Sequence, residues 1–311
     1  MNGEGHRGVE AERRRALLRA FAAAPLALAA PGLRAFDAER PVIDNMAGPY
    51  VPTPWVILDE MIKLAEIRAT DMVYDLGSGD GRLVIAAAKR HGARGVGVEY
   101  QGKLVEYSRV QARQEGVGAR VRFVQGDLFE TDLSPASVVT LYLLPKFVER
   151  LVPKLRAELA PGSRVVSHDY ALNPWPPEKT LIFDVEEKQN INGTTKTSLF
   201  YYVVPARVGG RWSLQAPAGW LPEGTQFSLR QAPDALEGHL HAPGAPAQEL
   251  RDLNVRAAAV RFGMLHGGRL MNFRGTVKGE GLQAVMEGEA SEARGERARW
   301  SARRIEPAPR P

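Results

Sequence analysis

The chain has 311 residues, a formal net charge of +5 and a pI of about 9.5. Its apolar fraction of 44% and charged fraction of 25% are typical of a globular protein with a sizeable core. The absence of cysteine excludes disulfides, thiolate catalysis and thiolate metal sites, and the six histidines lack the spacing of a metal-binding motif. No run of basic residues is interleaved with aromatic residues, so we predict no nucleic-acid partner.

Residues 1–30 have the pattern of an export signal. A basic segment precedes a short, alanine-rich apolar stretch, and residues 27–29 supply small residues in an A-x-A arrangement. Arg14-Arg15, followed by two leucines, resembles a twin-arginine leader. The stretch is too short for a stable membrane span. The pattern predicts a periplasmic or otherwise exported protein; the alternative is a cytoplasmic protein with an amphipathic or disordered N-terminal arm.

A linker rich in proline and glycine is predicted over residues 31–48, and the first folded domain over residues 49–205. The domain opens with an apolar helical pattern over residues 55–65. Thr53 is the expected N-cap of this helix, and Pro54 is expected at its first position.

Residues 73–82 read VYDLGSGDGR, which describes a short apolar strand, a tight glycine turn and the start of a helix. Gly77 and Gly79 leave room for a ligand to lie against bare backbone. The third glycine of the dinucleotide fingerprint is replaced by Arg82, and Asp75 would repel a pyrophosphate in this turn. A ligand with a sulfonium and a free amino group would instead be attracted to the carboxylate.

Two further acidic residues follow the next two predicted strands. Glu99 ends the strand at 94–99, where it is placed to accept hydrogen bonds from ribose hydroxyls. Asp127 follows the strand at 120–125. The set of three acidic residues predicts a nucleotide-type ligand.

The glycine turn and the three acidic residues resemble the motifs of the class I S-adenosylmethionine-dependent methyltransferases. The resemblance implies that S-adenosyl-L-methionine is the cofactor, that Asp127 receives its adenine amino group and that the amide of Leu128 approaches the ring. Neighbouring residues complete the predicted cofactor site: Thr53, Asp80 and Tyr100.

Strand and helix patterns alternate through residue 168 and predict a doubly wound α/β sheet with helices on both faces. A hairpin around the turn at 190–193 is expected to supply the reversed seventh strand of this seven-stranded, Rossmann-like fold. Residues 206–311 carry short alternating runs and recurrent turn signals, which predict an all-β domain, either a small barrel or a sandwich. The arginines of residues 297–304 are interpreted as a solvated strand face.

Two side chains at the expected rim of the sheet are candidates for catalysis. Tyr142, at the end of the fourth strand, either orients a methyl acceptor or only packs. His168 could serve as a general base, although a structural role is the alternative. We expect no dyad between His168 and Asp169, because adjacent strand residues point to opposite faces.

Residues 49–178 look like the branch that contains the ATP synthase c-subunit lysine methyltransferases and their bacterial relatives. This resemblance implies methyl transfer to a protein side chain, with lysine as the favoured acceptor and a small molecule as the other possibility. The leader and the β-rich domain depart from the branch. A different class of function, an exported binding protein without turnover whose β domain is the working part, is therefore also considered.

Overall fold

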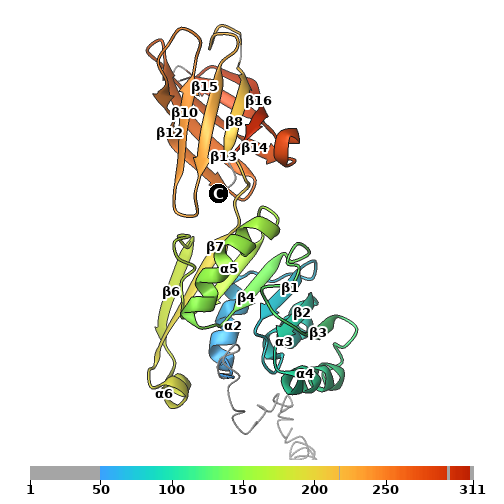
Figure 1. The fold of residues 1–311 in the computed structure, drawn as a ribbon. Helices are drawn as coiled ribbons and strands as arrows, with labels where there is room; N and C mark the ends of the chain where they lie inside the picture. The colour runs from blue at the N-terminus through green and yellow to red at the C-terminus, as the bar shows by residue number, and fades with distance from the viewer. Residues whose placement is uncertain (1–49, 217, 293–294, 309–311) are drawn as a thin grey trace, which may run out of the picture. The chain divides into compact units, whose positions relative to one another are not determined.

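The computed structural model describes residues 50–216, 218–292 and 295–308 (Figure 1). The predicted leader at 1–30 and the predicted linker at 31–48 lie outside the described residues. The described chain forms two separate sheets, one of seven strands and one of nine. Among the described residues, no helix is long and apolar enough to cross a membrane.

The first sheet has the strand order β3-β2-β1-β4-β5-β7-β6. Strands β1 to β5 pair in parallel, whereas β7 runs antiparallel to both β5 and β6. The doubly wound methyltransferase-type fold is therefore confirmed. The strands are β1 (Met72–Leu76), β2 (Arg94–Glu99), β3 (Val121–Gln125), β4 (Val138–Leu141), β5 (Arg164–His168), β6 (Lys179–Asp184) and β7 (Lys196–Val203).

Helices cover both faces of this sheet because its central strands are apolar on both sides. Val73 on β1 packs in a cluster with α2 and α3, whereas Tyr74, the next residue, packs in a cluster with α5. The alternation follows from the period of two along a strand. The helices are α2 (Trp55–Leu64), α3 (Arg82–His91), α4 (Gly102–Gln114), α5 (Pro145–Glu158) and α6 (Glu186–Asn192).

Two local predictions in this domain are wrong. The N-cap of α2 is Pro54 and not Thr53, and no side chain caps the helix. The predicted turn at 190–193 is the end of helix α6, which connects β6 to β7, and Gly193 closes it in the left-handed conformation at φ 81°. The reversed strand β7 still forms, so the error changes the connection and not the topology.

The second sheet is a nearly closed antiparallel barrel with the order β11-β10-β9-β8-β16-β15-β14-β13-β12. Strand β11 pairs with β10 and the next strand, β12, pairs with β13, so one short stretch of chain joins the two ends of the sheet. The strands are β8 (Gly210–Gln215), β9 (Gln226–Gln231), β10 (Leu236–His241), β11 (Gln248–Glu249), β12 (Arg251–Arg256), β13 (Ala259–His266), β14 (Arg269–Lys278), β15 (Val285–Glu292) and β16 (Arg297–Pro307).

Aromatic side chains fill the inside of the barrel. Phe262 stacks on Phe273 at a centroid distance of 5.0 Å, and the ring of Trp300 meets both edge-on at 5.4 Å. Gly275 on β14 lies opposite Gly288 on β15. A Cβ atom on Gly288 would lie 2.0 Å from the carbonyl oxygen of Arg274, so only glycine allows the two strands to approach this closely.

Three details of the barrel differ from the sequence prediction. The strand β12 was not predicted, and part of the strand predicted at 282–286 is a short 3-10 helix, η1 (Gly281–Gln283). Arg304, predicted on a solvated face, is buried with its guanidinium 4.6 Å from the ring centre of Trp212. The other arginines of β16 are exposed as predicted: Arg297, Arg299 and Arg303.

Candidate cofactor site

A cleft of about 260 Å³ lies at the carboxyl ends of β1, β2 and β4. In doubly wound folds, this edge of the sheet is where ligands bind. The cleft is lined by the segment 50–53, by the glycine loop after β1 and by residues 142–147 after β4. Of the predicted site residues, the structure places the following along the cleft: Thr53, Asp75, Gly77, Gly79, Asp80, Glu99 and Tyr142.

The glycine loop is built from left-handed residues, with φ 78° at Gly77 and 53° at Gly79. A Cβ atom on Gly79 would lie 2.6 Å from the ring of Tyr50. Glycine is therefore required here both for the backbone conformation and for the approach of the aromatic ring. Tyr50 lines the cleft, and sequence analysis did not identify it.

The backbone amides of the loop are already engaged within the protein. The amides of Gly77 and Ser78 both donate to the carbonyl of Val98, at 2.8 and 3.0 Å, and the amide of Gly81 donates to the carbonyl of Ser78 at 2.9 Å. A loop that holds a pyrophosphate offers such amides to the ligand. This geometry supports the exclusion of a dinucleotide.

Asp75 is a buried carboxylate at the end of β1, and one of its oxygens accepts a hydrogen bond from the hydroxyl of Thr140 at 2.7 Å. The pKa of Asp75 is raised to about 7, mainly by burial; the hydrogen bond from Thr140 opposes the rise, and the nearby carboxylates of Asp80 and Glu99 contribute to it. A cationic ligand beside Asp75 would offset this cost by favouring the ionised carboxylate.

Glu99 is also buried, and its carboxylate is held by two backbone amides. One oxygen accepts from Gly79 at 2.9 Å and the other from Gln101 at 2.8 Å. These bonds fix the carboxylate at the end of β2 and join it to the glycine loop. Each oxygen retains a lone pair for a further donor, as the predicted ribose contact requires.

An ion pair that the sequence analysis missed joins the loop to the start of the domain. The guanidinium of Arg82 binds both carboxylate oxygens of Asp80, with a shortest distance of 2.6 Å, and donates to the carbonyl of Thr53 at 2.9 Å. The side chains of the pair are only 9% and 6% exposed. Asp80 thus lines the cleft with its charge paired, and we call this group the Asp80–Arg82–Thr53 clamp.

Three of the predicted cofactor residues do not line the cleft: Tyr100, Asp127 and Leu128. Tyr100 follows β2 and is 46% exposed. Asp127 follows β3 at the same edge of the sheet, where its carboxylate accepts from the amide of Phe129 at 2.8 Å. The assignment of Asp127 and Leu128 to the adenine ring stays a prediction.

Of the two candidate catalytic residues, Tyr142 faces the cleft and His168 lies behind it. Their ring centroids are 3.9 Å apart. His168 is fully buried, and neither of its ring nitrogens has a hydrogen-bond partner among the described residues. The pKa of His168 is lowered to about 4, mainly by burial; Asp169 opposes the shift, and Lys188 contributes to it. The imidazole is therefore neutral near pH 7 and has no direct access to the cleft.

The expectation that His168 and Asp169 point apart is wrong. The imidazole Nε2 lies 3.5 Å from Oδ1 of Asp169, because Asp169 has left the strand and adopts φ 63°. That oxygen accepts from the ammonium of the buried Lys188 at 2.6 Å. The carboxylate is thus engaged by Lys188, and no hydrogen-bonded dyad forms between the two described residues.

The charges of the cleft define the kind of ligand it suits. Asp75, Asp80 and Glu99 line it, and only Asp80 is balanced by an arginine among the described residues. The excess negative charge, the bare glycine loop and the engaged amides favour a ligand with positive charge. The sulfonium and amino groups of S-adenosylmethionine fit this arrangement.

Comparison with known proteins agrees with this chemistry. The chain is 40% identical over 157 residues to a protein-lysine N-methyltransferase of Saccharolobus islandicus, covering 50% of this chain and 93% of that protein. This chain belongs to the same family, the class I S-adenosylmethionine-dependent methyltransferases. A profile of the ANTKMT methyltransferase domain matches residues 75–179. The predicted resemblance is confirmed, the chain is a methyltransferase, and S-adenosyl-L-methionine is its cofactor.

The chain is also similar to other methyltransferases. It is 37% identical over 138 residues to an ATP synthase c-subunit lysine N-methyltransferase of Xenopus laevis, covering 44% of this chain and 60% of that protein. A solved structure of an RNA methyltransferase from Salinibacter ruber, in complex with S-adenosyl-L-homocysteine, is 46% identical, covers 51% of this chain and 96% of that chain, and has a TM-score of 0.46.

Proposed function

We propose that this methyltransferase modifies the side-chain amine of lysine in a protein acceptor. The observation that carries the proposal is the identity of 40% to a protein-lysine N-methyltransferase, of which the chain covers 93%. The bound cofactor would supply an activated methyl group on a sulfonium. The methyltransferase domain would hold the cofactor, align the acceptor and exclude water.

We assign the cofactor to the buried carboxylates of the cleft. Asp75 is placed to hold a cationic amino group, and Glu99, fixed by its two amides, is placed to accept from hydroxyl groups. Tyr50 and the Asp80–Arg82–Thr53 clamp support the segment 50–53 against the glycine loop. Asp127 and Leu128 remain our proposal for the adenine end.

We assign the acceptor to the side of the cleft lined by Tyr142, Phe147 and Tyr170. Aromatic walls exclude water and contact the aliphatic part of a lysine side chain, and a phenolic oxygen can accept a hydrogen bond from its amine. His168 has no access to the cleft, so we assign it a structural role: its neutral ring supports that of Tyr142.

The test is transfer of labelled methyl groups from S-adenosylmethionine to a lysate of a strain that lacks this gene. We expect label in protein, sensitive to protease and resistant to ribonuclease, and methyl-lysine on mass spectrometry. Asp75→Ala should abolish the label, whereas Asp132→Asn, an exposed acid outside the cleft, should not. Label in RNA or only in small molecules would refute the lysine proposal.

The same assay examines the alternative of an exported binding protein without turnover. If the full chain binds S-adenosylmethionine but transfers no label to any fraction, the binding-protein alternative replaces the lysine proposal. We also propose that residues 1–30 act as an export leader. Fractionation of cells and N-terminal sequencing of the periplasmic protein test this, and a full-length cytoplasmic protein would contradict it.

A further inference from the structure

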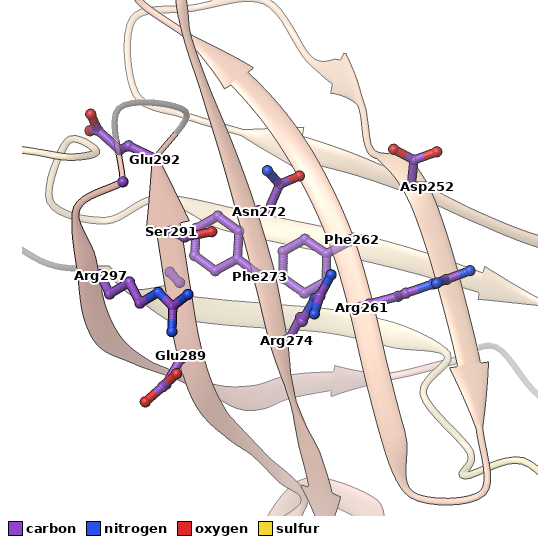
Figure 2. A pocket seen from close by; sticks show the side chains of 12 residues that line it. Asp252, Arg261, Phe262, Asn272, Phe273, Arg274, Glu289, Ser291, Glu292 and Arg297 are labelled. Carbon is purple, nitrogen blue, oxygen red and sulfur yellow. The ribbon is translucent and has the colours of Figure 1, made fainter.

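The barrel carries a hollow of about 580 Å³ on the outer side of β13, β14 and β15 (Figure 2). The backbones of Phe262 and Phe273, whose rings point into the barrel core, lie beneath it. Polar side chains border the hollow from adjacent strands: Arg261, Asn272, Arg274, Glu289, Ser291 and Arg297. A hollow of this size suits a small ligand.

The arginines of the hollow form no close ion pair with a described residue, although Glu289 on β15 lies opposite Arg274. Arg261 on β13 lies directly opposite Arg274 on β14, and like charges in such a pair are destabilising. Neither they nor Arg297 form an ion pair with any residue that the structure describes. The unpaired arginines leave the hollow with guanidinium groups available to an anion.

Flanking residues increase the positive charge. Arg251 lies opposite Gly263 on β13, and Arg299 lies opposite Glu289. Of the three acids at the rim, Glu292 is already paired with Arg269 at 2.9 Å, which leaves Asp252 and Glu289. Arginine therefore exceeds unpaired acid around the hollow.

We propose that this hollow binds a compact ligand that carries more than one phosphate group. The planar guanidinium donates two parallel hydrogen bonds to a phosphate, and Asn272 and Ser291 are further donors. The arginines are distributed over several strands, which suits separate phosphates better than a single one (Figure 2). Asp252 and Glu289 interrupt the positive surface and so disfavour an extended anionic surface such as a membrane or a nucleic acid.

The test is calorimetric titration of the full chain with pyrophosphate at low ionic strength. We expect binding that weakens as salt is added and that falls at least about tenfold in the double variant Arg261→Gln/Arg274→Gln. Arg303→Gln, an exposed arginine of β16 outside the hollow, is the matched control and should change the affinity less than about twofold. Saturation with S-adenosylhomocysteine should leave pyrophosphate binding unchanged, because the hollow and the cleft share no lining residue.

Three outcomes would overturn the proposal. Absence of pyrophosphate binding is the first, and equal binding by the double variant is the second. In the third, the same arginines bind phosphatidylglycerol vesicles or an RNA oligonucleotide but do not bind pyrophosphate. That result would make this face of the barrel a docking surface rather than a ligand site. Circular dichroism of the double variant distinguishes loss of the site from loss of the barrel.

Discussion

The cofactor cleft and the barrel hollow differ in whether their charged side chains are held by other groups of the protein. In the cleft, Glu99 is held by two amides and Asp80 by Arg82, so these acidic groups are fixed before any ligand arrives. In the hollow, Arg274 lies opposite Arg261 on one side and opposite Glu289 on the other, and it forms no close ion pair with a described residue. A site that aligns reacting groups needs fixed side chains, whereas a surface that attracts an anion needs only available charge.

The largest expected effect comes from breaking the clamp of the cleft. Arg82→Ala leaves Asp80 buried without its partner, and we expect a loss of about 3–5 kcal/mol in the free energy of unfolding. Arg90→Ala is the control: Arg90 lies on the same helix and pairs with Asp59 at the surface, so its loss should cost less than about 1 kcal/mol. Chemical denaturation measures both, and equal losses would show that the clamp contributes no more than a surface pair.

A second prediction concerns the cofactor affinity that depends on Glu99. Glu99→Gln replaces one of the two carboxylate oxygens by an amino group, removes the charge and disturbs the hydrogen bond from the amide of Gly79. We therefore expect S-adenosylmethionine to bind about ten- to a hundredfold more weakly. Glu106→Gln, on the exposed side of α4, should leave binding unchanged. Fluorescence or calorimetric titration decides; an unchanged affinity in Glu99→Gln would remove Glu99 from the site.

Much of the cleft could be predicted from the sequence, because its glycines and acidic residues lie within a few residues of strand ends. The Asp80–Arg82–Thr53 clamp could not be predicted from the sequence, because Thr53 and Arg82 are 29 residues apart and only the folded chain brings them together. The barrel shows the same limit. Leu282 indicated a strand but lies 61% exposed in η1, because local apolar character does not reveal which side chains the barrel buries.

A smaller effect is expected from the acceptor side of the cleft. If the hydroxyl of Tyr142 accepts from the acceptor amine, Tyr142→Phe should lower kcat/KM for the protein acceptor about tenfold, since one hydrogen bond is lost. The ring still packs against that of His168, so the affinity for S-adenosylmethionine should not change. Steady-state kinetics with the labelled acceptor are the measurement, and an unchanged kcat/KM would show that the hydroxyl of Tyr142 does not act on the acceptor.

The smallest expected effect is a change in stability when an arginine of the hollow is replaced. Arg261 repels Arg274 across one strand pair and Glu289 attracts it across the other, so Arg274→Gln should change stability by less than about 0.5 kcal/mol at low salt, and by less at high salt. Thermal unfolding at two salt concentrations measures this. A loss of stability would mean that Arg274 is a structural residue.

The pH dependence of cofactor binding tests the charge of the cleft most directly. The pKa of Asp75 is raised to about 7, so the unliganded fold loses stability as the pH rises from about 4 towards 7, while a cation bound beside Asp75 favours its ionised form. We therefore predict that affinity for S-adenosylmethionine rises about fivefold between pH 6 and pH 7, as the carboxylate ionises while the amino group of the cofactor is still protonated. In Asp75→Asn, binding should be weaker and independent of pH over this range. Wild-type affinity that does not change with pH, or the same pH dependence in Asp75→Asn, would contradict the assignment of Asp75 to the cationic part of the cofactor.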